Sequence, residues 1–361
     1  MDTTFMSSSA EQLEVQEVEG VESAAVGLDI LVFAAGFEDR SSFIIDNVEF
    51  SAGASCLLIK YVNDIDENTV VFEHYVQIAQ AKFSRENIHI VDLNTDDIEQ
   101  FSRDLEAQFK AFSPELRSVG VDVSGMTAYA ICLALKYSRK YRPFEKQRVF
   151  YTSAAEYIPT HQEYESLIEK QSGDEIAYIP KSMAMEMSDN LVVEAFSGHR
   201  SGDARTCLAI FAGYEVHRSS GTIDAINPSL LLIMYGLPGD GQLAWRTDLS
   251  KKLHAKFETT RRCATEDVST LFVQESLDLL ERYYNYLIDD YDLVLAPICS
   301  KMHSIAAYMF WERYGEIQLS FPLPIGYNIS HRPRGIGKAY FVDLYEQRML
   351  FRDVATIGAV D

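Results

Sequence analysis

Two short stretches of the chain carry the same set of polar residue types. Residues 36–42 read GFEDRSS and residues 213–220 read GYEVHRSS. A guanidinium binds phosphate through paired hydrogen bonds, a serine hydroxyl can orient the bound group, and a glutamate can act as a general acid or base. The repeat therefore predicts an anion site or a catalytic acid. Its candidate residues are Gly36, Glu38, Arg40, Ser41, Gly213, Glu215, Arg218 and Ser219.

Each of these residue types also has an ordinary structural explanation. The glycines could simply allow tight turns, and the two serines could cap the helices that follow. Glu38 could pair with Arg40, and Glu215 with Arg218, to hold the shape of each loop. A duplicated enzyme usually keeps its catalytic acid in one copy only. The presence of both glutamates therefore favours a symmetric structural or binding role.

A second pair of stretches contains small residues where a strand is expected to run into a helix. These are DVSGMT (122–127) and PICSKMHS (297–304). Unpaired backbone N–H groups and the positive end of the helix dipole favour anions at such a junction. The candidates for binding are Ser124, Gly125, Ser300 and Lys301. Asp122 is a candidate for stabilising positive charge on a substrate.

A third stretch, SHRPRGIGKAY (330–340), contains four basic side chains and no acidic one. It predicts either an electropositive binding loop, with His331 and Arg334 as contacts, or a solvated turn. Cys299 could act as a nucleophile with His331 or His303, since a helix N-terminus lowers the pKa of a thiol. The first copy has no cysteine at the position that corresponds to Cys299, so a repeated catalytic pair is not present. GIGK lacks P-loop spacing, and the eight histidines show no metal-binding pattern, so neither a cofactor nor a metal is expected.

Further matches place these stretches inside two copies of one larger unit. LLIKY (57–61) recurs as LLIMY (231–235), and YIPTH (157–161) recurs as YNISH (327–331), in the same order. Several matches in one order indicate a tandem duplication. Each copy is close to the usual domain size of about 100–150 residues.

The elements that must position the polar loops have the same order in both copies. Short apolar runs predict strands, and stripes such as Met126, Ala130 and Leu133 predict the inner faces of helices. Alternating strands and helices predict an α/β fold of two tandem Rossmann-like domains, with mainly parallel sheets and helices on both faces. The expected parts are a disordered acidic tail (1–27), the first domain (28–180), a connecting helix or linker (181–206) and the second domain (207–361). The polar loops then gather at the carboxyl ends of the strands, where such sheets bind ligands.

Composition narrows the function classes. The 361-residue chain has a net charge of −22, which disfavours generic wrapping of nucleic acid but permits a local basic pocket. It lacks an apolar run of membrane-spanning length and a signal peptide, so we expect no membrane partner and a cytoplasmic protein. The five scattered cysteines are expected to be buried thiols.

Two fused Rossmann-like halves with polar loops after strands one and four resemble the CARF and SAVED sensor domains of bacterial antiviral signalling. In that family the second loop often reads N-x-[ST]-G-G-T-K, which DVSGMT and CSKM partly echo. The resemblance covers about residues 28–350. It implies binding of a cyclic or linear oligonucleotide messenger at the junction of the halves. It also implies an effector protein as partner, since no effector segment is evident.

The sequence therefore favours a non-catalytic sensor that binds a nucleotide or another anionic small ligand in a composite pocket. One alternative is an enzyme, a hydrolase or glycosidase, that acts on a nucleotide-like substrate with Glu38 or Glu215 as acid/base. Another is an adaptor whose acidic surface and tail bind a basic partner.

Overall fold

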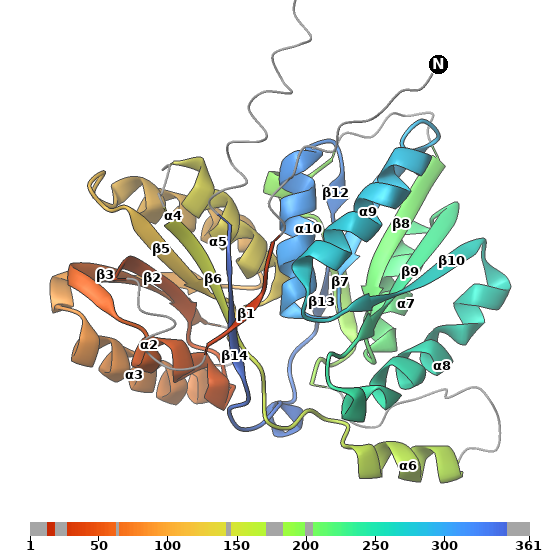
Figure 1. Ribbon diagram of the computed structural model, residues 1–361, viewed down its shortest axis with the longest axis horizontal. Coiled ribbons are helices and arrows are strands. Elements are labelled where there is room, and N and C mark those ends of the chain that lie inside the picture. Colours follow the sequence, from red (N-terminus) through yellow and green to blue (C-terminus); the bar gives the residue numbers. More distant parts are fainter. Residues whose placement is uncertain are drawn as a thin grey trace, which may run out of the picture.

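The computed structural model describes residues 13–18, 27–62, 65–141, 146–170, 183–198 and 205–344. Most of the predicted tail (1–27) lies outside these ranges, whereas residues 183–198 and 205–206 of the predicted connection (181–206) lie inside them. The described residues form two sheets with helices on both faces, as Figure 1 shows.

The first sheet has the strand order β1-β14-β6-β5-β2-β3-β4. The strands β6, β5, β2, β3 and β4 pair in parallel, whereas β14 and β1 are antiparallel additions at the edge opposite β4. The strands are β1 (Gln16–Glu17), β2 (Leu28–Ala34), β3 (Phe50–Tyr61), β4 (Ile88–Leu93), β5 (Ser118–Asp122), β6 (Lys146–Thr152) and β14 (Ala339–Asp343).

The second sheet repeats this order. It runs β10-β9-β8-β11-β12 and all its pairs are parallel, so it matches β4-β3-β2-β5-β6 strand for strand. Its strands are β8 (Arg205–Ala212), β9 (Leu230–Leu237), β10 (Cys263–Ser269), β11 (Tyr291–Pro297) and β12 (Gln318–Leu319). The predicted fold class is therefore confirmed.

Burial on both faces explains why the strands are apolar throughout. In β2, Ile30 and Val32 belong to the core that includes residues of α4 and α5, whereas Leu31 and Phe33 belong to the core against α3. A strand covered on both faces needs apolar residues at every position. The helices are α2 (Phe43–Asn47), α3 (Ile65–Lys82), α4 (Ile98–Ala111), α5 (Ala128–Lys140), α6 (His161–Lys170), α7 (Val216–Ile226), α8 (Trp245–Thr260), α9 (Val273–Leu287) and α10 (Lys301–Arg313).

The two halves meet along α5 and α10, which lie side by side in the centre of Figure 1. One continuous apolar core includes residues of both helices, and the predicted stripes on them are buried. Arg139 of α5 forms a 2.8 Å ion pair with Glu312 of α10. The N-terminal loops of the two helices lie at the same end of the interface, because Lys301 at the start of α10 bonds to the carbonyl of Met126, just before α5.

Segments from each half cross to the other. After β6 the chain runs to α6, where Tyr164 stacks on Trp245 of α8 with ring centroids 4.9 Å apart. In the opposite direction β14 pairs with β6, although it follows the second sheet in sequence. The crossing segments pair with each other through Glu156 and Arg334. A small sheet of β7 (Met187–Leu191) and β13 (Phe321–Pro324) completes the junction. The predicted boundaries between the parts remain predictions.

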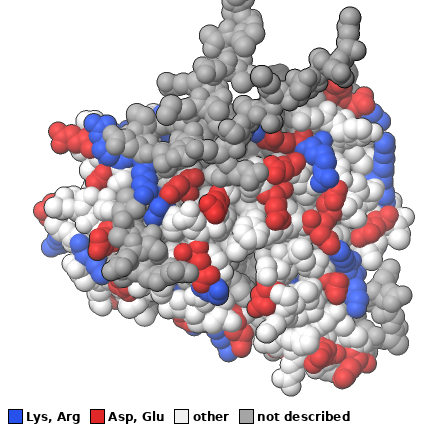
Figure 2. Space-filling model, in the orientation of Figure 1, with Lys and Arg blue, Asp and Glu red and all other residues white. Residues whose placement is uncertain are grey.

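In the view of Figure 2, Asp and Glu side chains are scattered among Lys and Arg. On the described part of this face the basic side chains do not form one continuous surface. Among the described helices, none has the length and apolar character needed to cross a bilayer.

Candidate functional site

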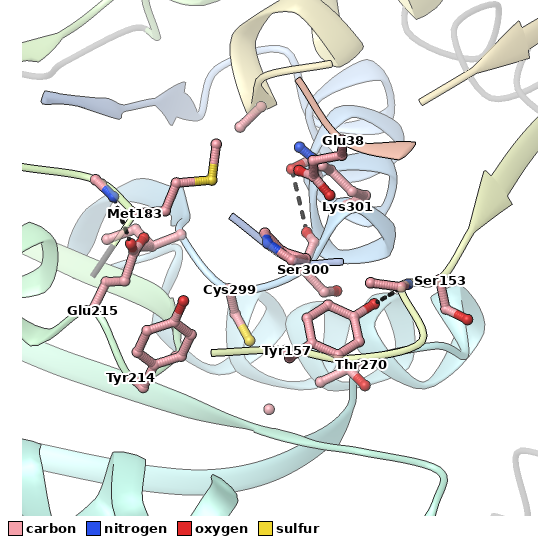
Figure 3. A pocket seen from close by; sticks show the side chains of 18 of the residues that line it. Glu38, Ser153, Tyr157, Met183, Tyr214, Glu215, Thr270, Cys299, Ser300 and Lys301 are labelled. Carbon is pink, nitrogen blue, oxygen red and sulfur yellow. Dashed lines mark hydrogen bonds between the residues drawn. The ribbon is translucent and has the colours of Figure 1, made fainter. Parts of the chain in front are cut away.

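A cavity of about 1900 Å³ opens between the halves, at the carboxyl ends of both sets of parallel strands. Its walls come from the loops that follow β2, β5 and β6 in the first half, and β8, β9 and β11 in the second. Equivalent loops of the two copies thus face one space. Figure 3 shows Glu38 and Lys301 on one side of it, Glu215 and Tyr214 on the other, with Cys299 and Ser300 between them in this view.

The structure brings ten of the sequence-predicted candidates together in this lining: Gly36, Glu38, Arg40, Gly125, Gly213, Glu215, Arg218, Cys299, Ser300 and Lys301. The other six are outside the lining: Ser41, Asp122, Ser124, Ser219, His331 and Arg334. Ser41 and Ser219 are buried and neither caps a helix, because Ser42 precedes α2 and Glu215 precedes α7.

Glu38 and Arg40 form a largely buried ion pair in the first half. The carboxylate and the guanidinium Nε are 2.5 Å apart, and Arg40 is only 4% exposed. Arg40 also donates to the carbonyl of Thr152 at 2.9 Å and to the hydroxyls of Tyr151 and Tyr157. Burial alone would lower the pKa of Arg40, but the charge of Glu38 and these contacts raise it overall. The guanidinium therefore holds the loop together rather than facing the cavity freely.

Glu215 and Arg218 repeat this pair in the second half in a more open form. They lie 2.9 Å apart, with side chains 14% and 19% exposed. Glu215 also accepts a hydrogen bond from the backbone N–H of Ala184 at 3.1 Å. In the first half, Tyr157 lies near Arg40. In the second half, Tyr327 lies close enough to Arg218 and Glu215 for both charges to act on its pKa. The pairing suggested by the sequence is present in both copies.

Lys301 is the first residue of α10, and in Figure 3 it lies on the same side of the cavity as Glu38. Its ammonium donates to the backbone carbonyl of Met126 across the interface. Burial lowers the pKa of Lys301 to about 8, and the charges of Arg40 and Arg218 act in the same direction. Glu38 and Glu215 oppose the shift. A half-buried ammonium among other cations gains most from an incoming anion.

The glycines in the first-half loops are required by close packing. A Cβ on Gly36 would lie 2.9 Å from the Cα of Gly125, and a Cβ on Gly125 would lie 2.9 Å from the carbonyl oxygen of Ala34. Neither glycine has a positive φ. Gly36 and Gly125 therefore let the loops after β2 and β5 approach each other, which the tight-turn interpretation did not anticipate.

The loops after the fourth strands differ between the halves. Ser124 is fully buried, where it donates to Asp122 at 2.5 Å and accepts from the N–H of Thr152 at 2.8 Å. Burial raises the pKa of Asp122 to about 7. Ser300 instead caps α10 by accepting from the N–H of His303 at 3.1 Å. The side chain of Ser124 therefore faces inward, whereas Ser300 lines the cavity.

Cys299 does not have the properties of a nucleophile. Burial raises the pKa of its thiol to about 12, so the expected lowering by the helix N-terminus is wrong. Its proposed partner His303 is buried, stacks on Phe211 at 4.3 Å and bonds to the carbonyl of Ser269. The N–H of His331 bonds within its own turn, to the carbonyl of Asn328. Nothing in this arrangement would deprotonate Cys299.

Arg246 is a functional candidate that the sequence reasoning missed. It lies in the first turn of α8 and lines the cavity, and its guanidinium donates to the carbonyls of Pro159 and Ile158 at 2.9 and 3.3 Å. The rings of Tyr214, Trp245 and Tyr157 lie 5.0, 5.1 and 5.7 Å from it. Burial lowers the pKa of Arg246. The available signal was a Trp-Arg pair just after the loop that follows β9.

Within the part of the chain that the structure describes, Arg246 also lacks a counter-ion. Among the described residues, no carboxylate lies within 4.0 Å of its guanidinium, and its hydrogen bonds are to carbonyl oxygens alone. A half-buried cation without a counter-ion is costly, and an anionic ligand would remove that cost. Within the described ranges, no group of three metal-binding side chains is present.

Comparison with known proteins adds little to this geometry. No protein-family profile and no curated protein matches the chain. Among solved structures, the chain is similar in fold to a type III CRISPR defence DNA nuclease activated by cyclic oligoadenylate. The likeness has a TM-score of 0.48 and 8% sequence identity, and it covers 85% of this chain and 67% of that one. It concerns the fold alone.

Proposed function

We propose that this protein binds a nucleotide-type anionic ligand in the cavity between its halves and acts as a sensor. The observation that carries the proposal is the convergence of Arg218, Arg246 and Lys301 on one cavity. The charges of Arg246 and Arg218 both act on Cys299, and that of Arg218 acts on Lys301, so the three cations surround one region. Three cations around one region favour a phosphate-bearing ligand.

The aromatic side chains support a ligand that also has a planar ring. Tyr157, Tyr214 and Trp245 line the cavity around Arg246. Stacking of a base on an aromatic side chain contributes about 1–3 kcal/mol. The volume of about 1900 Å³ exceeds that of most small-molecule sites, about 300–1,000 Å³, so more than one nucleotide unit can enter.

The geometry gives less support to the enzyme alternative. Glu38 and Glu215 each form an ion pair with an arginine, so both carboxylates already have a structural partner. Asp122 lies outside the cavity lining and cannot contact a substrate there directly. The residues proposed for catalysis therefore have structural partners in both halves.

The biological setting is a separate part of the proposal. A role as a cytoplasmic, CARF- or SAVED-like sensor in antiviral defence, with an effector protein as partner, rests on the loop motifs and the tandem halves.

Calorimetric titration tests the proposal. The panel contains adenosine and guanosine mono- and triphosphates, cyclic dinucleotides and short linear oligoadenylates. Lys301→Met and Arg246→Gln should each weaken the best ligand about 10- to 150-fold, since a hydrogen bond to a charged group contributes about 1.5–3 kcal/mol. The matched controls are Lys110→Met and Arg282→Gln, whose side chains are 53% and 66% exposed and lie outside the cavity.

Equal affinity in the cavity variants and the controls would reject the assignment of the pocket. Turnover of a panel nucleotide that is lost in Glu215→Gln would instead establish the enzyme alternative. Native mass spectrometry of protein purified from its own host would identify a ligand that remains bound.

A further inference from the structure

Two basic side chains of the cavity are bonded to main-chain carbonyls. Arg246 of α8 donates to the carbonyls of Pro159 and Ile158 at 2.9 and 3.3 Å, and Lys301 of α10 donates to the carbonyl of Met126. Among the residues that the structure describes, neither cation forms an ion pair within 4.0 Å. Burial lowers the pKa of both side chains, as expected for cations whose partners are neutral.

The Arg246 contact anchors the crossing segment that joins β6 to α6, residues 153–160, to α8. A second anchor follows directly, because Tyr164 of α6 stacks on Trp245 of α8 with ring centroids 4.9 Å apart. In Figure 1 this segment leads away from the first sheet and places α6 beside α8. The crossing segment and α6 are thus attached to α8 by two neighbouring contacts, one of which is made by a cavity cation.

A ligand phosphate competes with the carbonyls for the same cations. Arg246 and Lys301 line the cavity, and so do Tyr157 and Thr160 of the crossing segment. A phosphate oxygen is ionised, so its hydrogen bonds to a guanidinium or an ammonium are stronger than those of a neutral carbonyl. An arginine clamps phosphate through paired N–H groups, and both terminal nitrogens of Arg246 already donate to the segment. A phosphate clamped by these two nitrogens replaces the carbonyls of Ile158 and Pro159.

We infer that the Arg246 contact with these two carbonyls is a latch that the anionic ligand releases. The phosphate takes the guanidinium from the crossing segment, and the segment and α6 leave α8 as one unit. Lys301 exchanges the carbonyl of Met126 for the ligand in the same way, which loosens the contact between the loops before α5 and α10. The inference rests on the proposed function, because the same cavity must bind the anion.

Thermodynamic linkage gives the latch a consequence that simple binding does not have. A ligand that releases the segment binds more tightly when the segment is already held less firmly. The stack of Tyr164 on Trp245 provides the means, since Tyr164 lies outside the cavity lining and cannot contact the anion. Weakening this second anchor should therefore increase the affinity, whereas loss of a ligand contact decreases it.

Calorimetric titration of the full chain with inorganic tripolyphosphate tests this linkage. Tyr164→Leu should bind the probe about two- to tenfold more tightly than the unaltered protein, which corresponds to the usual strength of an aromatic pair. The matched control is Tyr286→Leu, at a position of α9 that is 85% exposed and outside the cavity lining. The control should leave the affinity unchanged.

Hydrogen exchange measures the release itself. Peptides that cover residues 153–166 should exchange at least about threefold faster when tripolyphosphate is bound. The reporting amides include Glu156, which donates to the carbonyl of Arg334, and Tyr164, which donates to that of Thr160. Without the probe, Arg246→Gln should already show the faster exchange, and tripolyphosphate should add nothing further. Arg282→Gln, at a 66% exposed position, should behave like the unaltered protein.

The outcomes separate the latch from the proposed function. Binding of tripolyphosphate with slower exchange in residues 153–166, or with equal or lower affinity in Tyr164→Leu, would overturn the latch and leave anion binding intact. Absence of binding by tripolyphosphate and by every nucleotide of the panel would overturn both. The exchange measurement on the unaltered protein decides the question even if Tyr164→Leu does not fold, which thermal melting shows.

Discussion

The pH dependence of ligand binding follows from Lys301. Its pKa is lowered to about 8 by burial, so the side chain changes charge close to physiological pH. At pH 7 about nine in ten molecules carry the charge, and at pH 9 about one in ten does. An anion binds the protonated form, so the affinity is highest well below pH 8 and decreases as the pH rises above 8. If the bound state keeps the proton, the affinity falls about tenfold, or about 1.4 kcal/mol, from pH 7 to pH 9.

Calorimetry across this range measures both affinity and proton uptake. Titrations of ATP in buffers with different ionisation enthalpies should show that a proton is taken up on binding, increasingly so above pH 8. Phosphate itself contributes little, because its second pKa is about 6. Asp122 titrates near the lower end of the range, since burial raises its pKa to about 7.

Two variants isolate the lysine. Lys301→Arg keeps a charge throughout and should give a nearly flat profile. Lys301→Met should bind weakly at every pH and should show only the smaller contribution of Asp122. The same tenfold decline in Lys301→Met as in the unaltered protein would refute the reasoning, and so would a flat profile in the unaltered protein.

Three further predictions concern stability and reactivity. Asp122→Asn should leave stability unchanged near pH 4 and raise it above pH 7 by at most about 4 kcal/mol in urea unfolding, because the folded pKa of about 7 exceeds the unfolded value of about 3.9 and the charged carboxylate is destabilising. Gly125→Ala should lower the free energy of unfolding by about 1–3 kcal/mol, because its Cβ would lie 2.9 Å from the carbonyl of Ala34. Gly239→Ala, with no heavy atom within 4 Å, is its control, and equal losses in both would contradict the packing argument. Cys299, with a pKa of about 12, should react with iodoacetamide at pH 8 far more slowly in native than in unfolded protein, and rapid labelling of the native protein followed by peptide mapping would restore it as a nucleophile.

Much of the fold could be predicted because it depends on local patterns. The apolar runs of β2 and β8 and the stripes of α5 and α10 each reflect burial along one element, which periodicity records directly. The repeated order of these elements was sufficient to predict two Rossmann-like halves, and the structure shows that they share one strand order. The Glu38–Arg40 and Glu215–Arg218 pairs were also open to prediction, because their members lie within one loop.

Other features depend on contacts between distant parts of the chain. Arg246 reaches the cavity because α8 packs against the crossing segment that ends in α6, and no repeated letters mark that contact. The pairing of β14 with β6 joins residues from opposite halves. The inward orientation of Ser124 depends on the N–H of Thr152 in β6, outside its own loop.

The sequence by itself thus determined the repeated sheets and the loops at their carboxyl ends, since spacing along one strand or helix specifies which face is buried. Only the tertiary structure decided which of the loop residues face the shared cavity and which cations remain accessible. The physical reason is that charge pairing, desolvation and close packing depend on distances across the α5–α10 interface, which the order of residues in either copy does not contain.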